Sequence, residues 1–211
     1  MALSPGGILI IFMMPFIGKF LDKVDARKMI AFGFVALSVS LFYMSHRLYL
    51  GIDFKHAVLL RMYQAFGLAF LFVPINTLAY VDVPQERSNS VSGLINLSRN
   101  MGGDVGIALV TTLLARRSQM HQVELVRHTT LFDAPFRERL DSITRALEHS
   151  GASTSDAALQ ASRALYRTVL AQAQTLAYVD VLFLIACGTA VMVPLAFLMK
   201  RPTPGAASMS H

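Results

Sequence analysis

The chain has 211 residues, of which 54% are apolar and 15% are charged, and its formal net charge is +6. An average soluble domain is roughly 45–50% apolar and about 25% charged, so this composition argues against a disordered chain, a disulfide-stabilised domain and an ordinary cytosolic enzyme. Eight arginines and six acidic residues lie between Ala115 and Gln174, a distribution typical of a membrane protein with one polar insert.

Five apolar stretches approach the roughly 20 residues that a helix needs to cross a bilayer. We predict membrane spans at 1–18, 29–45, 56–81, 91–114 and 175–199. We predict that residues 115–174 form a polar helical loop between the fourth and fifth spans. Residues 200–211 form a tail after the fifth span. The predicted fold class is therefore an all-α membrane protein whose direct partner is the lipid bilayer.

Basic residues follow the first apolar stretch instead of preceding it, which is unlike a signal peptide. These residues are Lys19, Lys23, Arg27 and Lys28. The positive-inside rule places this connection in the cytoplasm. Counting spans from there, the insert lies outside the membrane and the C-terminal tail lies inside.

Two spans carry a charged residue near their external ends, Arg61 in the third and Asp180 in the fifth. Both lie about a turn and a half from the start of their spans. Their similar depth predicts an ion pair if the two helices are neighbours. The alternative is that each side chain separately reaches the water at the interface.

The fourth span has one polar face, formed at helical spacing by Asn96, Arg99, Asn100 and Gly103. Asp104 adds an acidic group at a similar depth. Charged residues inside a span are costly and usually face a protein interior or a cavity. We therefore predict that this face lines a transport path.

Small residues and a proline mark sites of helix packing in the third and fourth spans. Gly102 and Gly106 form a pair four residues apart with Gly103 between them, a pattern that permits close helix approach. In the third span, Pro74 precedes Asn76. A kink at Pro74 would free a backbone carbonyl beside the Asn76 amide, and these two groups would extend the transport path. The alternative is that Pro74 only bends the helix.

The insert reads as helical. Apolar residues recur at helical spacing at Phe136, Leu140, Ile143 and Leu147. Gly151 ends this helix, and Ser153 with Asp156 forms a capping box that opens another. His121 and His128 are seven residues apart, and we interpret them as solvated surface histidines.

No pattern in the chain predicts an enzyme, a metal site or a cofactor. Cys187 stands alone in an apolar run, so neither a disulfide nor a paired thiol is expected. The basic residues form no compact stripe with aromatic residues between them, which argues against nucleic acid as a partner.

The segment GKFLDKVDARK, from Gly18 to Lys28, resembles the cytoplasmic loop motif of the major facilitator superfamily. Gly18 and Asp22 match the motif, and its basic positions correspond to Lys23, Arg27 and Lys28. Asp25 stands where the motif usually has a second glycine. The resemblance implies that this segment belongs to a gate that rearranges when the cytoplasmic side opens.

Residues 83–109 resemble the penultimate span of the fourteen-span drug:proton antiporter branch of that superfamily, although Asp104 replaces its usual small hydroxyl residue. Residues 172–184 resemble the start of the last span and include Asp180. The resemblance implies a proton-driven multidrug efflux transporter of the bacterial inner membrane. It also implies small, largely apolar substrates and cooperation with a periplasmic adaptor protein.

The same resemblance implies that these are the last five spans of a fourteen-span protein. We therefore expect a C-terminal part that does not transport alone. The alternative is a non-transporting membrane interaction module whose external loop binds a partner protein.

Overall fold

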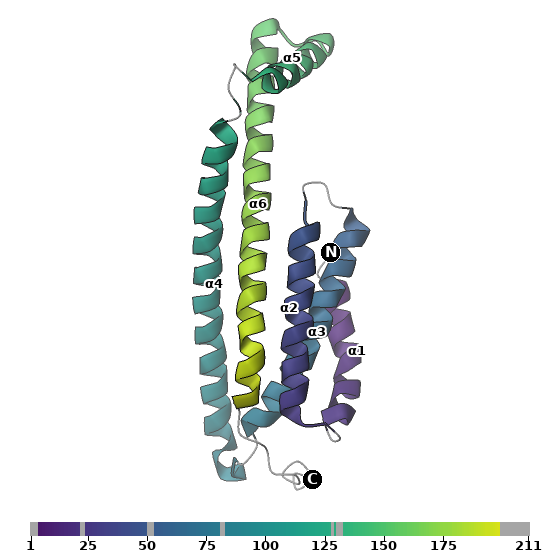
Figure 1. The fold of residues 1–211 in the computed structure, drawn as a ribbon, viewed down its shortest axis with the longest axis vertical. Coiled ribbons are helices and arrows are strands. Elements are labelled where there is room, and N and C mark those ends of the chain that lie inside the picture. The colour runs from purple at the N-terminus through teal and green to yellow at the C-terminus, as the bar shows by residue number, and fades with distance from the viewer. Residues whose placement is uncertain are drawn as a thin grey trace. The chain divides into compact units, whose positions relative to one another are not determined.

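The computed structural model describes residues 4–21, 24–49, 53–80, 83–127, 129 and 133–198. Every regular element in this part of the chain is helical, which confirms the predicted all-α class. In chain order (Figure 1) the elements are α1 (Ser4–Leu21), α2 (Ala26–Arg47), α3 (Phe54–Tyr80), the short 3-10 helix η1 (Gln85–Arg87), α4 (Ser88–Arg127), α5 (Ala134–His149) and α6 (Thr154–Leu198).

The helices divide into two compact units. The first unit, Met1–Leu109 with Leu182–His211, holds α1 to α3, the start of α4 and the end of α6. The second unit, Val110–Val181, holds the rest of α4, all of α5 and most of α6. The apolar spans and the polar insert thus fall largely into separate units.

Three helices are long and apolar enough to cross a membrane, by length and composition, among the described residues: α2, α3 and α6. The apolar part of α1, Gly6–Leu21, is shorter. Three of the five predicted spans therefore correspond to described helices of sufficient length and apolar composition. The spans predicted at 1–18 and 91–114 stay predictions.

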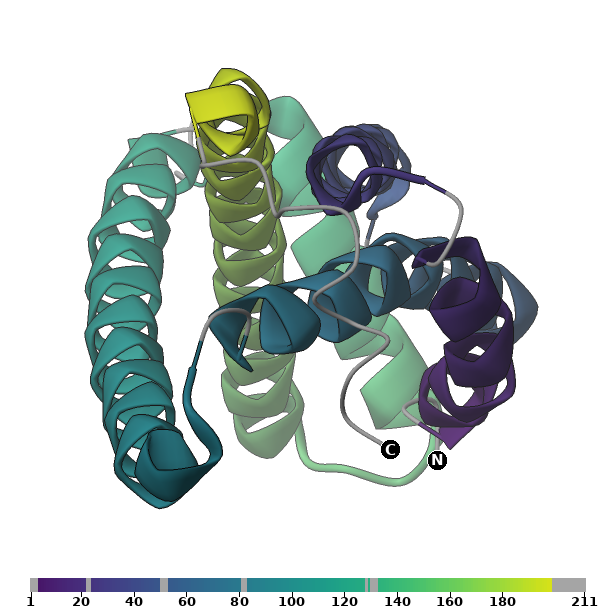
Figure 2. The same ribbon diagram turned by 90° about the horizontal axis from the view of Figure 1, so that it is seen from below.

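In the first unit, α3 packs against both α1 and α2 (Figure 2). Glycine allows the approach of α2: a Cβ atom built on Gly67 would lie 2.7 Å from the backbone nitrogen of Leu37. Likewise, a Cβ atom on Gly33 would lie 2.9 Å from Cγ of Leu71. Any side chain at Gly67 must therefore displace the backbone of α2.

Small clusters of buried apolar residues hold this unit together. One cluster contains Ile30, Ala31, Leu71 and Ala196, and the other contains Ile17, Met29 and Ala69. The first cluster ties the end of α6 to α2 and α3. Alanines supply part of each cluster, and their small side chains permit close packing without a large hydrophobic core.

In the second unit, α4 and α6 continue beyond the predicted membrane boundaries at 114 and 175. They have 40 and 45 residues, or about 60 and 68 Å at the rise of an α-helix. No glycine or proline interrupts α4 after Gly106, and the polar residues that follow favour a helix. Much of the predicted loop is therefore an extension of the two flanking helices.

The predicted helix in the insert is α5, and the residues of its apolar stripe are half-buried. Gly151 follows it with a φ of 97°, a left-handed conformation that glycine adopts without strain. One of the two hydrogen bonds of the predicted capping box is present at the start of α6, where the backbone nitrogen of Asp156 donates to the Ser153 hydroxyl at 3.2 Å.

Two serines of α2 differ in their hydrogen bonds, so we expect their replacement by alanine to affect stability differently. The Ser38 hydroxyl donates to the carbonyl oxygen of Ala186 at 2.9 Å, whereas the buried Ser40 hydroxyl has no hydrogen-bond partner in the described part of the chain. We expect Ser38→Ala to lower the free energy of unfolding by about 1 kcal/mol, since hydrogen bonds between membrane helices contribute roughly this much. Ser40→Ala should leave stability unchanged or raise it, because it removes an unsatisfied polar group.

Unfolding of the two variants in mixed detergent micelles, followed by circular dichroism, would measure this difference. Equal losses of stability in Ser38→Ala and Ser40→Ala would contradict the assigned hydrogen bond.

Candidate functional site

A polar contact joins α3 to the first half of α4 within the first unit. Nη2 of Arg99 donates to Oδ1 of Asn76 at 2.7 Å, and the guanidinium carbon lies 5.4 Å from the centroid of the Phe72 ring. Asn76 in turn donates through Nδ2 to the carbonyl oxygen of Phe72 at 2.7 Å. The amide is thereby oriented, and the cation is held between an amide oxygen and an aromatic face.

A second polar contact joins the same two helices. The hydroxyl groups of Tyr80 and Ser92 lie 2.9 Å apart, and Ser92 also donates to the carbonyl oxygen of Ser88 at 2.9 Å. No pattern in the sequence predicts Phe72 or Tyr80 for the site. Their signal was weak, because an aromatic residue in an apolar stretch is more often a packing residue.

The other residues of the predicted path lie on α4 and have no described partner. Asn96, Asn100 and Asp104 are exposed and make no side-chain hydrogen bond or ion pair with any residue that the structure describes. Of the five predicted path residues, the structure therefore brings Asn76 and Arg99 together and leaves the other three apart.

The predicted packing glycines of α4 are also uncovered. A Cβ atom built on Gly102, Gly103 or Gly106 meets nothing within 4 Å. Pro74, by contrast, is fully buried inside α3. Close packing at the three glycines stays a prediction that the described part of this chain does not itself fulfil.

Part of the predicted gate motif is described. Gly18 lies in α1 with open space beside it, whereas Asp22 and Lys23 lie outside the described residues. Asp25, at the unusual position of the motif, caps α2 by accepting from the backbone nitrogen of Arg27 at 3.2 Å. Carboxylate groups favour helix N-termini, so Asp25 has a local structural role there.

The basic end of the motif reaches the end of α6. Nη1 of Arg27 donates to the carbonyl oxygen of Phe197 at 3.5 Å, and its buried Nε atom has no hydrogen-bond partner among the described residues. Lys28, one residue further, is exposed. The hydrogen bond from Arg27 to Phe197 is longer than the roughly 2.7–3.2 Å of a usual N–H···O bond, so it is weak.

Arg61 and Asp180 belong to different units, and their predicted pair stays a prediction. Arg61 donates to the side-chain oxygen of Gln64. Asp180 contacts His121 and Arg117. His121 is only partly exposed and has a carboxylate partner, which the interpretation as a solvated surface histidine does not include, whereas His128 lies outside the described residues.

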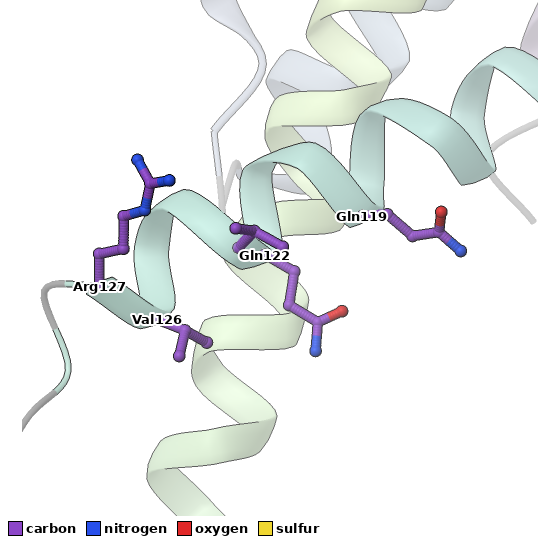
Figure 3. Close-up of a pocket in the computed structure, with 5 residues that line it drawn as sticks. Gln119, Gln122, Val126 and Arg127 are labelled. Carbon is purple, nitrogen blue, oxygen red and sulfur yellow. The ribbon is translucent and has the colours of Figure 1, made fainter.

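A shallow groove of about 670 Å³ runs along the outer part of α4. It is lined by Gln119, Gln122, Val123, Val126 and Arg127 (Figure 3). Every lining residue comes from one helix in the second unit, so this groove is separate from the contacts around Arg99.

Among the described residues, no three His, Cys, Asp or Glu side chains are grouped so that they could hold a metal ion. Cys187 is a free, exposed thiol.

Residues 1–114 match the sequence pattern of the Major Facilitator Superfamily. No solved structure matches the chain. The chain is 28% identical over 151 residues to the multidrug export protein EmrB of Escherichia coli, an alignment that covers 72% of this chain and 29% of that protein.

Two further relatives have similar identity. The probable multidrug resistance protein EmrY of Escherichia coli is 29% identical over 136 residues, or 64% of this chain and 27% of that protein. The colistin resistance protein EmrB of Acinetobacter baumannii is 28% identical over 195 residues, or 92% of this chain and 37% of that protein. The chain thus spans roughly a third of the length of these relatives.

Proposed function

From the premise that this chain belongs to the major facilitator superfamily, we propose that it is the C-terminal part of a proton-driven multidrug efflux transporter. The observation that carries the proposal is the guanidinium of Arg99, held on Asn76 at 2.7 Å within a predicted span. Charged side chains in spans are rare and mark substrate or ion pathways. The protein's relatives include multidrug export proteins, which supports drug-like, largely apolar compounds as substrates.

Exposed polar groups on α4 extend the proposed path beyond Arg99. Asn96, Asn100 and Asp104 are exposed on a helix that also carries exposed large apolar residues. Transporters of this fold bind substrate near the midplane, between two halves of the protein. We infer that these polar groups face that central cavity in the complete transporter, where water and substrate cover them.

The segment from Gly18 to Lys28 acts in this proposal as the cytoplasmic gate. Arg27 supplies the movable contact, because its hydrogen bond to the carbonyl oxygen of Phe197 is 3.5 Å long. Asp22 supplies the acidic partner for Arg27 in one of the two states of the gate. The complete protein lies in the bacterial inner membrane, where a proton gradient drives export.

A chimaera of Escherichia coli EmrB, in which this chain replaces the aligned region, tests the proposal. We expect energy-dependent dye efflux from cells that lack their own exporter, and no efflux from cells that express this chain alone. Efflux would be followed by fluorescence, and size-exclusion chromatography of a tagged protein would verify folding. A folded chimaera that exports no dye would contradict the proposal, and so would export by the chain alone.

A second candidate function is a membrane interaction module that binds a periplasmic adaptor. The extension of α4 and α6 beyond the predicted membrane boundary, with α5 between them, favours it. The same chimaera without α5 separates the candidates. Lost adaptor capture with full efflux favours the interaction module, whereas lost efflux with retained capture favours a direct part in transport.

A further inference from the structure

Three charged or titratable side chains meet at one carboxylate oxygen in the second unit. Oδ2 of Asp180 lies 2.9 Å from Nε2 of His121 and 3.5 Å from Nη1 of Arg117. Arg117 and His121 are one turn apart on α4, so they share a face, whereas Asp180 lies on α6. The cluster therefore connects two helices across 59 residues of sequence.

The cluster is partly buried and remains accessible to water. The side chains of His121, Asp180 and Arg117 are 29%, 32% and 40% exposed. On α6, Asp180 lies beside two nearly fully buried residues, Ala177 and Val181. This position at the edge of a packed face reduces solvent screening while protons still reach the imidazole.

The contact between His121 and Asp180 depends on the protonation of the imidazole. A neutral imidazole donates from Nε2 in only one of its two tautomers, and in the other it presents a lone pair to the carboxylate. A protonated imidazole donates from both nitrogens and adds charge, which shortens and strengthens a hydrogen bond. Imidazole changes charge between about pH 5 and 8.

Other charged and titratable side chains lie along the same two helices. Arg117 is a permanent cation on the same oxygen, and its charge does not change in this pH range. Further along α4, Glu124 pairs with Arg127 at 3.0 Å. Arg116 lines a separate groove on that helix, and Tyr178 of α6 is exposed.

We propose that His121 and Asp180 form a proton-binding site that closes the contact between α4 and α6, outside the path around Arg99. The proton adds to the imidazole and raises the charge of the three-residue cluster from zero to +1, and no other bond changes. Arg117 positions the carboxylate in both states. Any role of the site in export rests on the proposed function, but proton binding by this chain does not.

The distance between α4 and α6 as a function of pH tests the site. Spin labels would be attached to Met120→Cys on α4 and Gln172→Cys on α6, in a chain with Cys187→Ser and reconstituted in lipid nanodiscs. Both labelled positions are exposed. Double electron–electron resonance would give the populations of molecules with the short and with the long distance between the labels. We expect the ratio of the short-distance to the long-distance population to fall about fivefold from pH 5 to pH 8.

Four variants assign the effect. We expect His121→Gln to remove the pH dependence, and Asp180→Asn to give the long distance at both pH values. Arg117→Gln should keep the pH dependence, because the titrating group remains. Tyr166→Phe is the matched control: it removes a hydrogen bond between the same helices, from Gln122 at 3.3 Å, and should leave the pH dependence unchanged.

Two results would overturn the proposal. One is an equal ratio at pH 5 and pH 8 in the unsubstituted cluster, and the other is full pH dependence in a folded His121→Gln chain. Circular dichroism would establish folding, and Gln retains a hydrogen-bond donor near the Asp180 carboxylate. The distance measurement uses this chain and does not depend on export. An EmrB chimaera that exports no dye would contradict the proposed function, whereas distances that do not change with pH would contradict the proton-binding site.

Discussion

Replacing Gly67 by alanine is expected to lower the free energy of unfolding by about 1–3 kcal/mol, the usual cost of overpacking a close contact. The new methyl group would lie 2.7 Å from the backbone nitrogen of Leu37 and 2.9 Å from its Cα atom. Backbone atoms cannot rotate away as a side chain does, so α2 and α3 must separate. Reversible unfolding in mixed micelles measures the loss, and a larger residue at this position should prevent assembly.

Gly7→Ala provides the matched control for this prediction. Gly7 is also in an apolar helix, but a Cβ atom there meets nothing within 4 Å. Because alanine is favoured over glycine inside a helix by up to about 1 kcal/mol, Gly7→Ala should be neutral or stabilising. Equal stability of the two variants would show that α2 and α3 do not approach closely at Gly67.

The second large effect is expected at Arg99. In the EmrB chimaera, Arg99→Ala should reduce the rate of dye export roughly tenfold to a hundredfold, the range expected for the loss of a hydrogen bond to a charged group. Asn76 and Phe72 hold this guanidinium in place. Initial efflux rates, normalised to the amount of protein in the membrane, measure the effect.

Two controls separate position from charge at Arg99. Arg99→Lys keeps the charge but loses the planar fork, so export should fall less than in Arg99→Ala. Ser98→Ala changes an exposed neighbour and should leave export unchanged. If Arg99→Ala exports dye at the unsubstituted rate, Arg99 is not part of the path.

The helical class, the amphipathic α5 and the capping box before α6 could be predicted from the sequence, because each depends on local spacing. Asn76 and Arg99 were also both predicted for the path from their position inside apolar stretches. That they bond to each other was not predicted, because single-sequence patterns carry no information on which spans are neighbours.

The predicted boundaries at 114 and 175 mark a change of polarity and not the end of a helix, since polar residues such as those after Leu114 also favour helices. The contact of His121 with Asp180 is not predictable from local spacing, because the two residues are 59 positions apart. The glycine signal also pointed to a different helix. The described contacts require Gly33 and Gly67, whereas the pattern at Gly102 and Gly106 has no described neighbour.

The unbroken length of α6 relaxes the requirement on its sequence. The helix has 45 residues, whereas a membrane span needs roughly 20 mostly apolar residues. Only about half of α6 must therefore be apolar, and its remaining turns carry polar residues such as Arg163 and Arg167 without the cost of a charge in lipid.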